Sequence, residues 1–238
     1  MTCSLVTPWW RRRRGAGSAT GGVAVTRVLD WDHPAVRSLV ARVDEACPAD
    51  PAALLRVAHR LIVESVRPVY SVNELRPISR TLGRGRGSCS QRLALLEGVA
   101  RAGGIATRVR GLLVDGRFWY PRFPRLRLLV PDHVILAWPE FHLPSGWVSA
   151  SEVYGPLGGF GTSSGFTNEG ETLFDAIATT AVDWDGVCQG GACDLSATVL
   201  ADLGRYDSRE ALFHAHGQTL CWPLTTLADP VLSRWAPS

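Results

Sequence analysis

The chain has 238 residues, of which 46% are hydrophobic and 20% are charged, and its net charge is +3. This composition is typical of an ordinary globular protein, with either one sizeable domain or two small ones, and it excludes a largely disordered chain. The charge is too small to indicate a polyanionic partner, so we expect no nucleic-acid binding. All the basic residues are arginines, and because there is no lysine, both a Schiff-base mechanism and a Walker A loop are excluded.

The N-terminus, residues 1–22, is predicted to be a disordered tail, because a run of four arginines is followed by Gly, Ser and Ala. No apolar segment follows the arginines, and none elsewhere approaches the roughly 18 residues of a membrane span. We therefore expect a cytoplasmic protein with no membrane partner. The six cysteines show no C-x-x-C pair, so we expect reduced thiols; Cys188 and Cys193 are spaced so that they could approach each other. No group has zinc-site spacing, and no metal or cofactor is expected.

The first predicted elements are a weak strand at 23–29 and two helices. Pro34 is expected to open one helix after Asp32, and Pro51 to open the next after Asp50, because Pro suits the first helical turn and Asp the cap. Pro68 should end the second helix, and a loop ending in TLGRGRGS should follow.

The helix that begins at Cys89 is the most informative element. Ser88 and Gln91 have the spacing of a capping box, which predicts Cys89 as the first helical residue. The apolar residues that follow recur on one stripe up to Gly103-Gly104, a predicted left-handed cap. At the positive end of a helix dipole we expect a lowered thiol pKa and a reactive thiolate, with Arg84 and Arg86 adding to the field. The alternative is that Cys89 is only a small buried hydrophobe.

The segment after Gly104 is rich in strand formers. Residues 105–114 predict a strand, Asp115-Gly116 a hairpin turn into 117–120, and 133–137 and 147–150 two further strands. Pro139 indicates a sheet edge or bulge. No helix intervenes, so the strands should be antiparallel. The fold class is therefore α+β, a Cys-bearing helix packed on an antiparallel sheet.

The C-terminal third contains a glycine-rich loop at 155–165, interpreted as a linker or as a lid, and helices at 171–182, 195–203 and 208–220. The predicted organisation is a tail (1–22), a catalytic core (23–155) and a C-terminal loop and helical extension (156–238). No chemistry is predicted for the extension.

A cysteine nucleophile needs a base, usually a histidine held by a third polar group. Of the six histidines, His133 alone begins a strand of the sheet on which the Cys89 helix should pack, and His142 precedes a turn. A structural role is the alternative for such a strand histidine. We therefore predict Cys89 and His133 as nucleophile and base.

Three segments resemble the transglutaminase-like superfamily: GRGSCSQRLALLEGVARAGGIATRVRG, PDHVILAW and GWVSASE. The resemblance covers roughly residues 55–155 and implies a papain-like fold, with Cys89 as nucleophile and His133 as base. The position of the family's aspartate is occupied here by Ser151, with Glu152 next to it. The sequence thus predicts Glu152 as the third catalytic residue, and Ser151, Asp115 and Asp132 remain alternatives.

What the resemblance implies is a cysteine-dependent acyl-transfer enzyme that forms or cleaves an amide or thioester bond through a Cys89 acyl-enzyme. The substrate would be a peptide, an amide or a thioester, with carrier-bound thioesters included. Because Ser151 departs from the family pattern, the alternative is a catalytically inactive binding or scaffold module of the same fold.

Overall fold

The computed structural model describes residues 19–46, 48–123, 127, 130–157, 166–188 and 193–218. The α-helices are α1 (Pro34–Glu45), α2 (Pro51–Ser65), α3 (Ile78–Gly83), α4 (Cys89–Ala102), α5 (Leu173–Thr179) and α6 (Arg209–His216). The strands are β1 (Arg67–Pro68), β2 (Arg86–Gly87), β3 (Thr107–Asp115), β4 (His133–Leu143), β5 (Gly146–Ser149) and β6 (Val199–Tyr206). Short 3-10 turns are η1 (Gly116–Trp119), η3 (Ala150–Glu152) and η5 (Ser196–Thr198).

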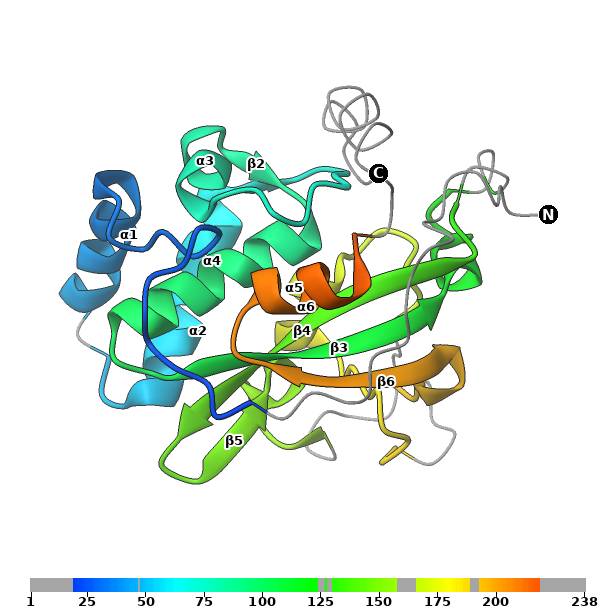
Figure 1. Cartoon of the computed structure of the whole chain (residues 1–238). Coiled ribbons are helices and arrows are strands. Elements are labelled where there is room, and N and C mark those ends of the chain that lie inside the picture. The colour runs from blue at the N-terminus through cyan, green and yellow to red at the C-terminus, as the bar shows by residue number, and fades with distance from the viewer. Residues whose placement is uncertain are drawn as a thin grey trace.

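The main sheet is antiparallel with the strand order β5-β4-β3-β6, and β1 and β2 form a separate two-stranded parallel pair. Figure 1 shows α1 to α4 gathered beside this sheet, with α6 lying across the front of its strands. The predicted α+β class is confirmed, including the antiparallel direction of the strands.

The two long helices at the N-terminal end begin largely as predicted. Asp50 caps α2 by accepting a hydrogen bond from the Ala53 amide at 2.8 Å. The cap of α1, however, is His33 and not Asp32: the His33 ring accepts from the Ala35 amide at 3.2 Å. Pro34 fixes the first turn in both the predicted and the observed arrangement.

Helix α4 begins at Cys89 as the capping box predicts. Ser88 Oγ accepts from the Gln91 amide at 3.3 Å, and Gln91 Oε1 accepts from the Ser88 amide at 3.2 Å. The single apolar stripe, in contrast, understates the burial of the helix, since every residue from Ser90 to Arg101 is buried. The reason is tertiary, because α4 is contacted by α1, α2, α3, α5 and β4. A helix that is covered all round lies at the centre of a domain.

The β3–β4 ladder runs from Thr107 opposite Phe141 to Asp115 opposite His133. Side chains alternate between the two faces. Those of Leu112, Val114, Leu136 and Trp138 belong to the main core, and those of Val109, Ile135 and Ala137 pack with Leu212 and Phe213 of α6. The helix α6 therefore closes one face of the sheet.

The predicted hairpin at Asp115-Gly116 is wrong. Residues 116–119 form the 3-10 turn η1 instead of a strand, and β3 pairs with β4. Asp115 Oδ1 accepts from the Arg117 amide at 2.8 Å, which starts the turn. The Gly116 amide donates to the Asp132 carbonyl at 2.8 Å, and the Pro131 backbone lies so close that no Cβ fits at Gly116.

The helix predicted at 195–203 is also wrong, because this segment contains η5 and the first five residues of β6. The open edge of β3 accepts β6 as an antiparallel neighbour, with register shifts between Gly111 and Leu112 and between Leu113 and Val114. Pairing with a distant strand thus overrides the local helical pattern. The weak strand predicted at 23–29 is absent; the structure has only an isolated bridge between Gly22 and Thr107 there.

Cys188 and Cys193 form a disulfide, so the expectation of reduced thiols is wrong for this pair. Asp183 brings the two cysteines together: its carboxylate accepts from the Cys188 amide at 2.7 Å, and its own amide donates to the Cys193 carbonyl at 3.0 Å. Cys89 is a free thiol. Cys3, Cys47 and Cys221 lie outside the described residues.

In the C-terminal third, α5 and α6 form within the ranges predicted as helical. Most of the glycine-rich loop, 158–165, and residues 1–18 of the predicted tail lie outside the described residues. In the part of the chain that the structure describes, no helix has the length and apolar character required to cross a bilayer.

Candidate functional site

Cys89 occupies the first position of α4 and keeps part of its surface exposed to solvent. The first amides of a helix have no partner within the helix, so they can serve a group bound at that end. One of them, the Ser90 amide, favours the ionised form of the Cys89 thiol, although burial has the larger effect and opposes it. The sequence thus correctly predicts a thiol at the head of a capped helix.

The electrostatic setting of Cys89 differs from the prediction. Burial raises the pKa of the Cys89 thiol, the Glu74 charge raises it further, and Arg122, the Ser90 amide and Arg92 lower it. The net pKa is above the ordinary value, so the expected lowering by the helix start does not prevail. The surroundings of Cys89 in the free protein therefore favour the neutral thiol over the thiolate.

Arg122 is the larger of the two cationic influences on Cys89. Its Nε donates to Asn168 Oδ1 at 3.0 Å, one terminal nitrogen donates to the Glu171 carbonyl, and a further hydrogen bond reaches the Tyr70 phenol. Burial raises the pKa of Tyr70, and Arg122 opposes that rise. These contacts hold the Arg122 guanidinium in place.

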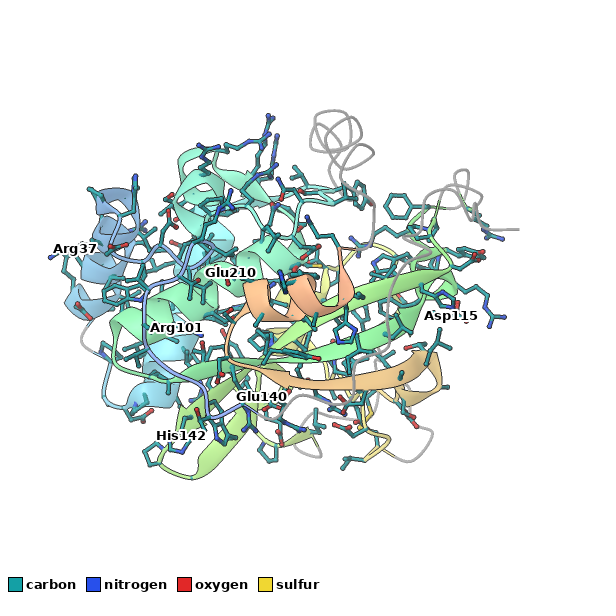
Figure 2. All side chains as sticks on the ribbon, viewed as in Figure 1. Arg37, Arg101, Asp115, Glu140, His142 and Glu210 are labelled. Atoms are coloured by element: carbon teal, nitrogen blue, oxygen red, sulfur yellow. A yellow bond between two sulfur atoms is a disulfide. The ribbon has the colours of Figure 1, made fainter. Side chains whose placement is uncertain are left out.

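His133 is the first residue of β4, as predicted, and its side chain is exposed. It lies directly opposite Asp115 on β3. Hydrogen bonds from Arg117 are the main cause that lowers the pKa of the Asp115 carboxyl, and His133 contributes to the lowering. In Figure 2, Asp115 lies at the end of the sheet remote from Glu140 and His142.

Glu152 is exposed at the end of η3, directly after the buried Ser151. The β4–β5 ladder pairs Ser149 with Glu140, and His133 lies seven residues further along β4. At about 3.3 Å per residue that separation is about 23 Å, whereas three residues span at most about 10 Å. The register therefore places Glu152 away from His133 and Asp115 beside it.

Sequence reasoning missed a chain of polar side chains next to Cys89. Ser90 Oγ donates to Glu74 and accepts from Arg209 at 2.9 Å, and Arg209 Nε donates to Glu97 Oε1 at 2.6 Å. One signal was available, namely Glu97 within the apolar run LALLEGVA, because a buried carboxylate requires a cation. Nothing in the sequence identified Arg209 as that cation.

Within the described ranges, no group of three or more His, Cys, Asp and Glu side chains could hold a metal ion. Besides burial, the groups that act on the pKa of the Cys89 thiol are the Glu74 carboxylate, the Arg122 guanidinium, the Ser90 amide and the Arg92 guanidinium.

The chain matches no family model, no curated protein and no solved structure. The chemistry of Cys89 and its surroundings is therefore the basis for a functional assignment.

Proposed function

We propose that the protein is a cysteine-dependent acyl-transfer enzyme with Cys89 as the nucleophile. The observation that carries this proposal is a free cysteine, with part of the residue at the surface, at the first position of a capped 14-residue helix. Reactive cysteines are commonly found at helix starts. The α+β arrangement supports the proposed transglutaminase-like fold, in which such a helix packs on an antiparallel sheet.

In the first step, the Cys89 sulfur attacks the carbonyl carbon of an amide or thioester while its proton passes to a base. The first amides of α4, which have no partner within the helix, would stabilise the oxyanion of the tetrahedral intermediate. Collapse of this intermediate breaks the bond to the leaving amine or thiol, which takes up the proton. A thioester on Cys89 results, and an amine or water then resolves it.

The base in this proposal is His133, with Asp115 in place of Glu152 as the carboxylate that orients its ring. The support for Asp115 is its position directly opposite His133 in the β3–β4 ladder. A carboxylate beside an imidazolium stabilises its charged form through a charge-assisted hydrogen bond. His133 lies on the same face of β4 as Ile135 and Ala137, the face that α6 covers, and not on the face against which α4 packs. For the ring to receive the Cys89 proton, this end of β4 therefore has to rearrange when substrate binds.

The proposed substrates are peptide amides or acyl thioesters, including carrier-bound ones. The chain itself offers no lysine amine as an acceptor, so the amine would come from another molecule.

A second candidate function, a non-catalytic binding or scaffold module, is favoured by one observation. Burial and Glu74 hold the pKa of the Cys89 thiol above its ordinary value, which makes the free thiol a poor nucleophile. A protein that only binds its partner has no need of a thiolate.

Acetylation by 4-nitrophenyl acetate distinguishes the two functions. The enzyme should release a burst of 4-nitrophenolate equal to the protein concentration and gain one acetyl group on Cys89, detected by intact mass and peptide mapping. The Cys89→Ser variant should lose the burst by at least about 10³-fold in rate. Its melting temperature should be unchanged, because Ser also suits a helix start.

The Cys47→Ser variant is the matched control and should keep the burst. If the unaltered protein shows no burst, or if Cys89→Ser retains it, the protein is not an enzyme of this type and the binding module stands.

A further inference from the structure

Ser90, the residue after Cys89, lies between two charged side chains from distant parts of the chain. Its hydroxyl donates to the Glu74 carboxylate and accepts from Arg209 Nη1 at 2.9 Å. Because the guanidinium can only donate, the hydroxyl proton has to point towards Glu74. The Glu74 carboxylate is thereby held against the first turn of α4.

Arg209 is anchored more firmly than a surface cation could be. Its side chain and that of Glu97 are both fully buried, and Nε donates to Glu97 Oε1 at 2.6 Å while Nη2 donates to the Ala137 carbonyl at 3.3 Å. Buried ions persist only where partners compensate their desolvation. The Arg209 guanidinium therefore has little freedom to leave Ser90.

The Arg209 guanidinium contacts two residues of α4 at once, Ser90 and Glu97, and we call this arrangement the clamp. Ser90 and Glu97 are seven residues apart and so lie on the same face of the helix, two turns from each other. Arg209, from α6, holds both residues and also the β4 backbone at Ala137. The clamp thus fixes the head of α4, where Cys89 lies, relative to the sheet.

We propose that Glu74 is a positioning residue that restrains the reactivity of Cys89 in the free protein, and that Ser90 and the Arg209–Glu97 pair hold its carboxylate there. The inference deepens the proposed function, since it concerns the regulation of the same thiol, and only its consequence for turnover rests on that function. The same inference gives α6 a role at the site, because Arg209 of α6 contacts Ser90.

The charged groups that face Cys89 come from several segments. Glu74, from the segment before α3, opposes ionisation of the thiol, while Arg122, after η1, and Arg92, on α4, favour it. A neighbouring like charge disfavours ionisation and typically moves a pKa by about one to three units. Removing the Glu74 charge while the two arginines remain should therefore shift the balance towards the thiolate.

The test is the pH dependence of Cys89 alkylation by limiting iodoacetamide, followed by peptide mass mapping. In Glu74→Gln, which keeps the size of the side chain, the midpoint of the alkylation curve should move down by about one pH unit, so that Cys89 labels about tenfold faster below the midpoint. Ser90→Ala, which removes the hydroxyl that contacts the Glu74 carboxylate but keeps the Arg209–Glu97 pair, should move the midpoint in the same direction by less.

The matched control is Glu64→Gln, which removes a carboxylate exposed on α2 and should leave the curve unchanged. Melting temperatures of all variants are measured alongside, because a purely structural role would lower them without moving the midpoint. A Glu74→Gln curve that coincides with that of the unaltered protein overturns the proposal. A midpoint that moves up in Glu74→Gln also overturns the proposal.

Failure of this proposal and failure of the proposed function are separable. Alkylation reports the charge next to Cys89 whether or not the protein turns over a substrate, whereas the 4-nitrophenyl acetate burst reports catalysis. A shifted midpoint without a burst would keep the role of Glu74 and reject the enzyme. A burst with an unshifted midpoint would keep the enzyme and reject the role of Glu74.

Discussion

Asp115 and His133 lie directly opposite each other at the last pair of the β3–β4 ladder. Asp115 also starts the turn η1, because its carboxylate accepts from the Arg117 amide at 2.8 Å. Asp115, which lies opposite the predicted base His133, is thus held in place by a hydrogen bond from the neighbouring backbone. This arrangement makes Asp115 the carboxylate to test as the orienting group.

Replacing Asp115 by Asn should slow the 4-nitrophenyl acetate burst by about 10²- to 10⁴-fold, by analogy with the aspartate of a catalytic triad. An Asn side chain still accepts a hydrogen bond at a turn, so the fold should be retained. His133→Ala should abolish the burst, and His142→Ala should not. Glu152→Gln should leave the rate unchanged; a large loss in that variant, with none in Asp115→Asn, would restore Glu152 as the orienting residue.

The Arg92–Asp175 ion pair is predicted to stabilise the packing of α5 on α4. The Arg92 side chain is 1% exposed, and its two terminal nitrogens donate to Asp175 at 3.1 and 2.8 Å. Burial would raise the pKa of Asp175, but Arg92 holds it below its ordinary value. Asp175→Asn leaves a buried cation without its counter-ion and should lower the free energy of unfolding by about 2 kcal/mol, discounted because Asp175 is partly exposed.

Urea unfolding monitored by tryptophan fluorescence checks this value. The surface pair Arg42–Glu64, at 3.8 Å, supplies the comparison, and Glu64→Gln should change the free energy by less than about 0.5 kcal/mol. Equal effects of the two substitutions would contradict the prediction.

His59 should make the stability depend on pH. The ring is buried, its Nε2 donates to the Phe174 carbonyl at 2.6 Å, and its Nδ1 accepts from the Tyr154 hydroxyl at 3.0 Å. Burial lowers the pKa of His59 from 6.5 in the folded state. Below pH 6.5 the unfolded chain therefore binds a proton that the folded protein does not, and the free energy of unfolding falls as the pH falls towards the folded-state value.

Urea midpoints measured between pH 7.5 and pH 5 should show this decline. In His59→Gln the decline over this range should be smaller, even if the variant is less stable at every pH. An unchanged slope in the variant would assign the effect to other groups.

The Cys188–Cys193 disulfide closes a loop of six residues. In the chain-entropy description, a cross-link of this length stabilises the folded state by about 2 kcal/mol. Thermal unfolding with and without a dithiol reductant should therefore differ by several degrees. The double variant Cys188→Ser/Cys193→Ser should melt at the reduced temperature and show no response to the reductant. A reductant response that persists in the double variant would point to another cysteine.

The sequence by itself determined the elements whose cause is local. The capping box joins Ser88 and Gln91, three residues apart, so the start of α4 at Cys89 could be predicted without knowledge of the fold. The strand that begins at His133 and the antiparallel direction of the sheet followed from residue pattern and from the absence of intervening helices.

Only the tertiary structure decided what surrounds Cys89. The Ser90–Arg209 contact joins residues 119 positions apart, and the Glu97–Arg209 pair spans 112. The tertiary structure also decided the state of residues 199–203, where pairing of β6 with β3 replaces the predicted helix. It decided the direction in which the pKa of Cys89 moves, because burial outweighs the effect of the helix start. Such effects depend on which segments meet in space and on how much water they exclude, and neither quantity is encoded in the spacing of neighbouring residues.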